Sequence, residues 1–422
     1  MKTNILIYNL TQIFLASILF IAVFIYFPFM ALLLCILVFI VNKNIKALFI
    51  SISLFLSLVT YTLDYHNYYP DVIRYYSEYE HNIFYALIKL KLYRFFVFSI
   101  MQSIGLNASF YSFFSIFIFF YFLLKSSQNY LLAINHKLDT IKKIILFLII
   151  ILSGVPFTIY FSFENMLAIV IFNYAISCYC LNNKYAFSFF VFLSLLIHSS
   201  VIILIPLFSI AILLYKKKIK IISTIICLSA FFSIITFLLN FEVNTGIDFI
   251  DSVFDKAYRY GSNEWSVLTT SELLHYIPIV LLKIAITLII SLSIIKDNKY
   301  TKINVLIYFS IIYSLTILFF IYNRMFSIRF GWSLSLISFI LIYIYSMDFI
   351  TNNLKKLIVI LIVPVCLISI PNLFILSKIG NQLTFNNDFL FFNSIYDFNR
   401  KIEIPNRKTL NQIEKKTTND RE

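Results

Sequence analysis

The chain has 422 residues, of which 61% are hydrophobic and only 13% are charged. Soluble domains contain about 45–50% apolar residues, so the composition excludes a soluble globular protein and indicates an integral membrane protein. The net charge of +14 does not call for nucleic acid, because basic side chains in a membrane protein record its topology.

The apolar runs recur from one end of the chain to the other, and most approach the ~20 residues of a bilayer-spanning helix. They are continuous rather than alternating, which excludes a transmembrane β-barrel. The first run has no cleavage site after it and is expected to be a helix rather than a signal peptide. The expected fold is an all-α polytopic membrane protein of about 12 to 14 spans, 13 being favoured. These spans lie near 5–25, 28–42, 46–63, 108–124, 143–160, 164–181, 185–198, 200–215, 219–239, 273–295, 303–321, 327–347 and 356–376.

Basic residues gather in alternate connectors between these runs. Half of the 34 Lys and Arg lie with the N-terminus and in the connectors near 43, 125–143, 184, 216–220, 296–302 and 355. The positive-inside rule assigns this side to the cytoplasm. Of the 20 acidic residues, only Asp139, Asp297 and Asp348 fall on that side. The N-terminus is therefore predicted inside, the C-terminus outside, and the polar chemistry on the outer face. A multi-span domain over 1–376, with outer loops at 64–107 and 240–272, would precede a polar tail at 377–422.

The segment 83–105 is apolar but contains three cations, Lys89, Lys91 and Arg94. Burying them in a span would cost about 2.5–3.5 kcal/mol each on insertion scales. We therefore expect an amphipathic helix along the outer interface instead of a span.

Polarity is most concentrated in "DYHNYYPDVIRYYSEYE" at 64–80. This stretch is either an ordinary interfacial loop, since Tyr favours the headgroup zone, or a carbohydrate-binding lip. In the second reading carboxylates accept hydrogen bonds from sugar hydroxyls and aromatic faces pack on the pyranose ring. The candidate glycan-handling residues here are Asp64, Tyr65, Tyr68, Asp71, Arg74, Tyr75 and Glu78.

Other polar residues on the predicted outer face have both a structural and a functional reading. His198 ends an apolar run and is either a structural residue or a general base. Arg324 and Arg329 flank a predicted outer turn, where guanidinium groups either reach lipid headgroups or bind a diphosphate. Glu164 begins a predicted helix, where a carboxylate also suits the helix dipole.

The loop at 240–272 carries Asp248, Asp251, Asp255, Arg259 and Tyr260, which form either a solvated face or a lid in which Arg259 contacts glycan. The sequence has no glycine-rich phosphate loop, no HExxH and no GxSxG, so nucleotide, zinc and serine hydrolysis have no support. Five cysteines lie in apolar runs without a CxxC pair, which favours buried thiols over metal ligands.

Four of these pieces, taken in order, resemble the EpsG family of Wzy-type polysaccharide polymerases. They are "DYHNY" with "DVIRYY" at 64–76, "SFENMLAIVIFNYAI" at 162–176, "HSSVIILIP" at 198–206, and Asn323-Arg324 with Arg329. The second piece departs from the family pattern, because Glu164-Asn165-Met166 stands where the family usually has an Arg-Gln pair. A cation needed there must come from elsewhere in the chain, or this glycan does not need it.

The resemblance implies a glycosyltransferase with a GT-C-like helical bundle in the bacterial inner membrane, active at the periplasmic face. It would move a growing glycan from undecaprenyl diphosphate to a lipid-linked repeat unit of O-antigen, capsule or exopolysaccharide. Arg324 and Arg329 would stabilise the diphosphate, while His198, Asp71 or Asp64 would serve as base. No cofactor is expected, although the acidic loop could bind a divalent cation. Membrane lipids, a chain-length regulator and a flippase are the expected partners.

Two other classes fit parts of the pattern. A flippase for lipid-linked oligosaccharides would have charges in mid-membrane cavities, and Lys283 is the only mid-span charge on this map. A glycosyltransferase with a polyprenyl-phosphate sugar donor would place its carboxylates after the first span, whereas Asp64 follows the third.

Overall fold

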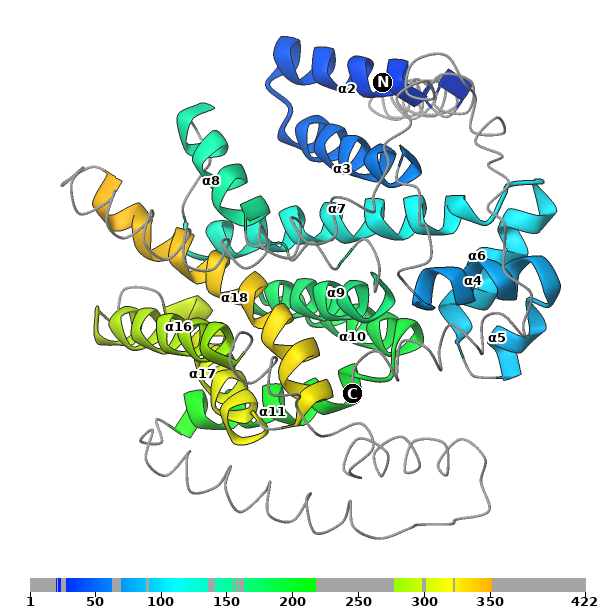
Figure 1. Cartoon of the computed structure of the whole chain (residues 1–422). Coiled ribbons are helices and arrows are strands. Elements are labelled where there is room, and N and C mark those ends of the chain that lie inside the picture. Colours follow the sequence, from blue (N-terminus) through cyan, green and yellow to red (C-terminus); the bar gives the residue numbers. More distant parts are fainter. Residues whose placement is uncertain are drawn as a thin grey trace, which may run out of the picture. The chain divides into compact units, whose positions relative to one another are not determined.

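The computed structural model describes residues 28–62, 70–88, 91–135, 141–153, 163–217, 277–297, 301–321 and 323–350, together with positions 20, 22, 23, 155 and 159. Every regular element in these residues is a helix (Figure 1). The helices are α2 (Pro28–Asn42), α3 (Ile45–Thr62), α4 (Pro70–His81), α5 (Phe84–Ile88), α6 (Leu92–Ser103), α7 (Ser109–Ala133), α8 (Ile141–Ser153), α9 (Phe163–Cys180), α10 (Lys184–Ile197), α11 (Val201–Lys217), α16 (Ile277–Asp297), α17 (Asn304–Phe319) and α18 (Arg324–Ile350), with a 3₁₀ turn η2 (Thr301–Ile303).

The predicted all-helical membrane character is confirmed for this part of the chain. Five of the described helices are long and apolar enough to cross a bilayer: α7, α9, α16, α17 with η2, and α18. Shorter apolar helices correspond to α2, α3, α10 and α11. The predicted spans at 5–25, 219–239 and 356–376, the loop at 240–272 and the tail at 377–422 lie outside the described residues, apart from positions 20, 22 and 23. The total of 13 spans and the orientation of the termini remain predictions.

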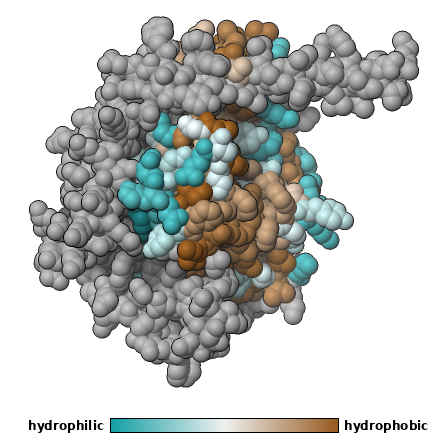
Figure 2. Space-filling model, turned by 90° about the vertical axis from the view of Figure 1, so that its right-hand side faces the viewer, coloured by the Kyte–Doolittle hydropathy of each residue, from teal (hydrophilic) through white to brown (hydrophobic). Residues whose placement is uncertain are grey.

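Exposed apolar side chains are frequent on the described helices, as expected where lipid replaces water. On α2 they include Leu37 and Val41, and on α5 and α6 they include Ile88, Phe96 and Ile100. Figure 2 shows apolar residues (brown) gathered on one face beside hydrophilic ones (teal).

The chain divides into two compact units, and α7 and α9 each contribute residues to both. The described part of unit 1 holds α2 to α6, the first half of α7 and the first turn of α9. The described part of unit 2 holds the rest of α7 and α9 with α8, α10, α11 and α16 to α18.

In unit 1 the segment 83–105 differs from the prediction of one continuous amphipathic helix. The chain forms α5 and then α6, and α6 starts only at Leu92. Arg94 lies on the buried side of α6 with 3% of its surface exposed, whereas Phe96 and Ile100 are exposed. No helix of spanning length forms in the described part of this segment, as predicted, and its position along the interface stays a prediction. What the sequence did not indicate is that Arg94 has buried partners.

In unit 2 the helix α7 runs to Ala133, beyond the predicted span at 108–124. The added turns are polar, but their side chains bond to α9. The Tyr130 hydroxyl donates to Oδ1 of Asn173 at 2.8 Å, and Nδ2 of Asn173 donates to Oγ of Ser126 at 3.3 Å. Nδ2 of Asn129 donates to Oγ of Ser177 at 3.0 Å. Hydrogen bonds of this kind join helices in membranes, where a polar group without a partner is costly.

We expect Asn173→Leu to reduce the free energy of unfolding by about 1 kcal/mol, because it removes the side-chain hydrogen bonds to Tyr130 and Ser126 and leaves these two only their backbone acceptors. Thermal unfolding of the purified protein in detergent measures this. Ser209→Ala is the control, since that exposed hydroxyl bonds only Ile205 of its own helix. Equal stability of the two variants would contradict the assignment.

Candidate functional site

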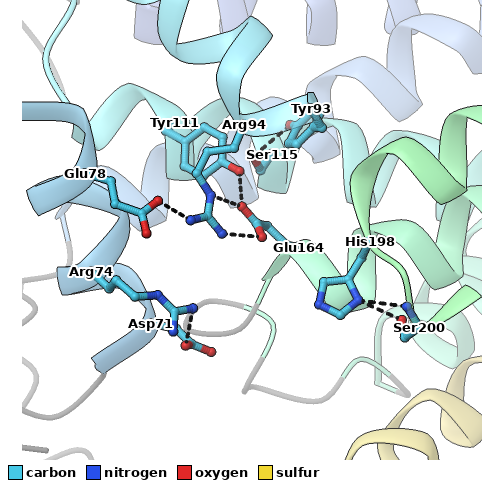
Figure 3. A network of polar contacts seen from close by, with 10 residues as sticks. All are labelled: Asp71, Arg74, Glu78, Tyr93, Arg94, Tyr111, Ser115, Glu164, His198 and Ser200. Carbon is cyan, nitrogen blue, oxygen red and sulfur yellow. Dashed lines mark hydrogen bonds and ion pairs between the residues drawn. The ribbon is translucent and has the colours of Figure 1, made fainter. Parts of the chain in front are cut away.

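The centre of unit 1 is a buried ion-pair cluster around Arg94. Its guanidinium donates from Nε to Oε1 of Glu164 at 2.7 Å and from Nη2 to Oε2 at 2.6 Å, a two-pronged contact. Its third nitrogen, Nη1, donates to Oε2 of Glu78. Figure 3 shows Arg94 held between the two carboxylates, which come from α4 and α9. One arginine therefore connects three helices that are far apart in the sequence.

Aromatic rings enclose this guanidinium. The carbon at its centre lies 4.0 Å from the centroid of the Tyr75 ring, a cation–π distance. The hydroxyl of Tyr111 donates to Oε1 of Glu164, so that oxygen accepts two hydrogen bonds. The rings of Tyr75, Tyr111 and Phe163 contact one another with centroids 5.3–5.9 Å apart. The rings exclude water, which strengthens the ionic contacts inside them.

Arg94 is the cation that bonds both carboxylates directly, while Lys91 adds positive charge near Glu164 and Arg74 near Glu78. Burial by itself lowers the pKa of Arg94, but Glu164 raises it well above the ordinary value, so the guanidinium stays charged. Both oxygens of Glu164 have donors. Oε1 of Glu78 is buried and has no hydrogen-bond partner among the described residues. This oxygen therefore keeps an unused acceptor position beside a fixed guanidinium.

The sequence of α4 explains how Glu78 reaches this position. Pro70 occupies the first turn, where its missing N–H costs nothing, and the acidic Asp71 beside it suits the helix dipole. Apolar and aromatic side chains then recur with helical spacing and form the buried face, namely Val72, Tyr75, Tyr76 and Tyr79. Glu78 lies on the edge of that face and is 8% exposed.

The buried rings correct the picture of an aromatic lip for this part of 64–80. Tyr76 bonds Ser112 at 2.6 Å, Tyr79 donates to the carbonyl of Leu106, and Tyr75 covers Arg94. Their faces are therefore occupied by the protein itself. Asp71 and Arg74 form a pair at 2.9 Å on the exposed side of α4 and are open to solvent. Asp64, Tyr65 and Tyr68 lie outside the described residues, as does Arg259.

His198 lies between α10 and α11 in unit 2. Its Nδ1 accepts the backbone N–H of Ser200 at 3.1 Å and lies 3.0 Å from the Ser200 hydroxyl (Figure 3). In a neutral imidazole whose Nδ1 accepts, Nε2 carries the proton and is a donor. In this arrangement Nε2 can donate a hydrogen bond but cannot accept a proton. For His198 to act as a base, Nδ1 would have to exchange its hydrogen bond with the Ser200 N–H for one with the substrate hydroxyl.

Arg324 and Arg329 lie on the same helix and not on two sides of a turn. Arg324 is the first residue of α18, and Arg329 follows in its second turn, half-buried. Five residues correspond to about 140° around a helix, so the two positions face different directions. Binding of one diphosphate by both arginines stays a prediction, and it would require their long side chains to reach around the helix to the same ligand.

No group of His, Cys, Asp and Glu in the described residues has an arrangement that could hold a metal ion. The acidic loop considered for a divalent cation lies outside them.

Arg94 is the central residue that the sequence did not identify. It looked like an interfacial cation because three basic residues interrupt one apolar run. The available signal was the presence of acidic residues at 78 and 164 on the same predicted face of the membrane. The structure also supplies a cation beside Glu164, where the family pattern has arginine, since Arg94 comes from α6.

The sequence model of the EpsG family matches residues 48–389, most of the chain and every residue of this cluster. The chain belongs to the EpsG family. EpsG proteins are a Wzy-like polymerase family of the bacterial inner membrane. No match is found among curated proteins or among solved structures.

For this EpsG protein we expect Arg94→Met to reduce the free energy of unfolding by about 3–5 kcal/mol, because it removes the cation that bonds both buried carboxylates directly. The double variant Arg94→Met/Glu164→Met should recover a large part of that loss, since only one unpaired carboxylate remains. Thermal unfolding in detergent across the double-mutant cycle gives the coupling energy.

The matched control is Arg74→Met, which breaks an Arg–carboxylate pair whose side chains are 45% and 32% exposed. Exposed pairs contribute about 0–1 kcal/mol, so the change should be small. Similar losses for Arg74→Met and Arg94→Met would contradict a special role of the buried pair.

Proposed function

We propose that this protein is a polysaccharide polymerase that transfers a growing glycan from undecaprenyl diphosphate to a lipid-linked repeat unit at the outer face of the inner membrane. The observation that carries the proposal is the EpsG match over residues 48–389. The product would be an O-antigen, a capsule or an exopolysaccharide. Membrane lipids surround the substrate, and a flippase and a chain-length regulator are the partners expected beside such an enzyme.

In the proposed reaction a sugar hydroxyl of the acceptor attacks the anomeric carbon of the donor glycan. The bond from that carbon to the diphosphate oxygen breaks, a glycosidic bond forms, and undecaprenyl diphosphate leaves. The hydroxyl proton passes to a base, and the electron pair of the broken bond stays on the diphosphate oxygen, so the leaving group gains one negative charge. The diphosphate ester supplies the energy, so no nucleotide is needed.

The chemistry requires a base or acceptor for the hydroxyl, and Glu78 is the carboxylate that we place in this role. Of the two buried carboxylates in the cluster, Glu164 has its acceptor oxygens occupied by Arg94 and Tyr111. Glu78 has Oε1 unoccupied, and Arg94 fixes its orientation through Oε2. Asp71, with Arg74 beside it, is the exposed alternative on the same helix.

The chemistry also requires positive charge at the departing diphosphate. Arg324 and Arg329 keep this proposed role, with Arg329 half-buried in the first turns of α18. A flippase or a glycosyltransferase with a polyprenyl-phosphate donor would handle a related lipid, so the assay must separate polymerisation from export.

The test of polymerisation is the ladder of surface polysaccharide on a gel from a deletion strain. If the protein polymerises, deletion leaves lipid carrier bearing a single outward-facing repeat unit, and the wild-type gene restores the ladder. If no outward-facing repeat unit appears at all, export has failed and a flippase is the better assignment.

Glu78→Gln should decrease polymerisation by about 10²–10⁴-fold, because the amide keeps the size and the contact with Arg94 but cannot take the proton. Glu80→Gln is the matched control, since Glu80 lies two residues further on α4 and is exposed. Ladder intensity is measured against the amount of folded protein in the membrane. A normal ladder with Glu78→Gln would remove Glu78 from the reaction.

A further inference from the structure

Unit 2 contains a buried lysine that the proposed reaction does not use. Lys283 lies six residues after the start of α16, about 9 Å along the helix, and is 2% exposed. Its ammonium group has no hydrogen-bond or ion-pair partner among the described residues. A cation at this depth is costly, and ionisable residues inside membrane helices commonly mark substrate or ion sites.

The hydroxyl groups around Lys283 belong to three packed helices (Figure 1). One turn further along α16, the hydroxyl of Thr287 lies 2.5 Å from that of Ser338 on α18. Lys283 lies one turn before Thr287 on α16. In the same way, Ser335 lies one turn before Ser338 on α18. The helices α16 and α18 both run antiparallel to α17, so these two earlier turns lie at the same level.

The third helix, α17, brings another hydroxyl to this region. Ser310 on α17 contacts Ser291 on α16 at 2.8 Å, and the two helices are antiparallel because a short connection joins them. Four residues after Ser310 is Ser314, which is therefore level with Thr287. The hydroxyl oxygens of Ser314 and Ser335 are buried and have no hydrogen-bond partner in the part of the chain described.

The ammonium of Lys283 is positively charged and can only donate hydrogen bonds, and each of the two unused hydroxyls also has a hydrogen to donate. An anion is the ligand that can accept from all three and balance the charge. Phosphate oxygens accept charge-assisted hydrogen bonds from lysine and weaker ones from serine. Arg329 lies nine residues before Ser338 on α18. Lys283 is four residues before Thr287, which contacts Ser338, so Arg329 lies about 7–8 Å further toward the start of α18 than the level of Lys283. A second cation therefore lies between Lys283 and the helix ends.

We propose that Lys283, Ser335 and Ser314 form an anion site that binds the diphosphate of the polyprenyl carrier. The inference rests on the proposed function for the identity of the lipid, and on the burial and the unused donors for the site itself. The carrier's phosphate groups would take the hydrogen bonds that these three residues leave unmade.

The test uses the full-length protein purified in detergent and three probes: undecaprenyl diphosphate without glycan, inorganic pyrophosphate, and phosphatidylglycerol. We expect undecaprenyl diphosphate to bind and to raise the melting temperature. Lys283→Met should weaken this binding at least tenfold, whereas Lys283→Arg should keep it within about threefold because a positive charge that can donate to phosphate remains. Lys296→Met is the control, since Lys296 is an exposed lysine at the end of the same helix.

The melting temperature of ligand-free Lys283→Met gives a second readout. Removal of an unpaired buried cation should leave this temperature unchanged or raise it. A marked decrease would show that Lys283 pairs with a carboxylate of the chain, which overturns the proposal. Unchanged binding of undecaprenyl diphosphate by Lys283→Met would also overturn it. Tighter binding of phosphatidylglycerol than of undecaprenyl diphosphate would replace the carrier by a membrane phospholipid.

These measurements are separable from the polymerase proposal. Lys283-dependent binding of undecaprenyl diphosphate together with a normal ladder in the deletion strain would support the anion site and refute polymerisation. Loss of the ladder in the deletion strain, together with binding that does not depend on Lys283, would support polymerisation and refute the anion site.

Discussion

The structure of unit 1 depends on one buried guanidinium. Arg94 would be too costly to place in an apolar environment alone, and it is stable there because Glu164 and Glu78 supply three hydrogen bonds and the opposite charge. The same contacts fix the relative positions of α4, α6 and the first turn of α9. Tyr75, Tyr111 and Phe163 complete the enclosure and keep water away from the ion pairs.

This arrangement gives the two carboxylates different roles. Glu164 is fully committed, with every oxygen bonded, so its function is to hold Arg94 in place. Glu78 is bonded through one oxygen only, and the other is buried beside a permanent positive charge. Preorganised groups of this type are effective in catalysis because they do not have to be reoriented during the reaction. This is why the proposed reaction places the acceptor hydroxyl at Glu78.

Polar groups in unit 2 follow a different rule. Along α7 and α9 the amides and hydroxyls satisfy one another, which joins helices that have little hydrophobic driving force to associate within lipid. Between α16, α17 and α18 the pairing is incomplete: the buried hydroxyls of Ser314 and Ser335 have no hydrogen-bond partner in the described structure, and Lys283 is buried on α16. The fully paired groups serve helix packing, and the incomplete pairing around Lys283 is the basis of the proposed anion site.

The sequence by itself determined the membrane character, the helical class and nine apolar helices near their predicted positions, because continuous hydrophobic runs leave the backbone no other way to satisfy its hydrogen bonds in lipid. It also identified the EpsG family from short polar pieces. It could not determine that α7 continues through the polar residues after 124, since those residues are stable in a helix only when α9 supplies their partners. The sequence also did not determine that the tyrosines of 75–79 are buried or that Arg94 is paired. Both follow from helix packing, which brings residues 78, 94 and 164 together. Which charges are paired is decided by contacts between distant segments, and no local pattern contains that information.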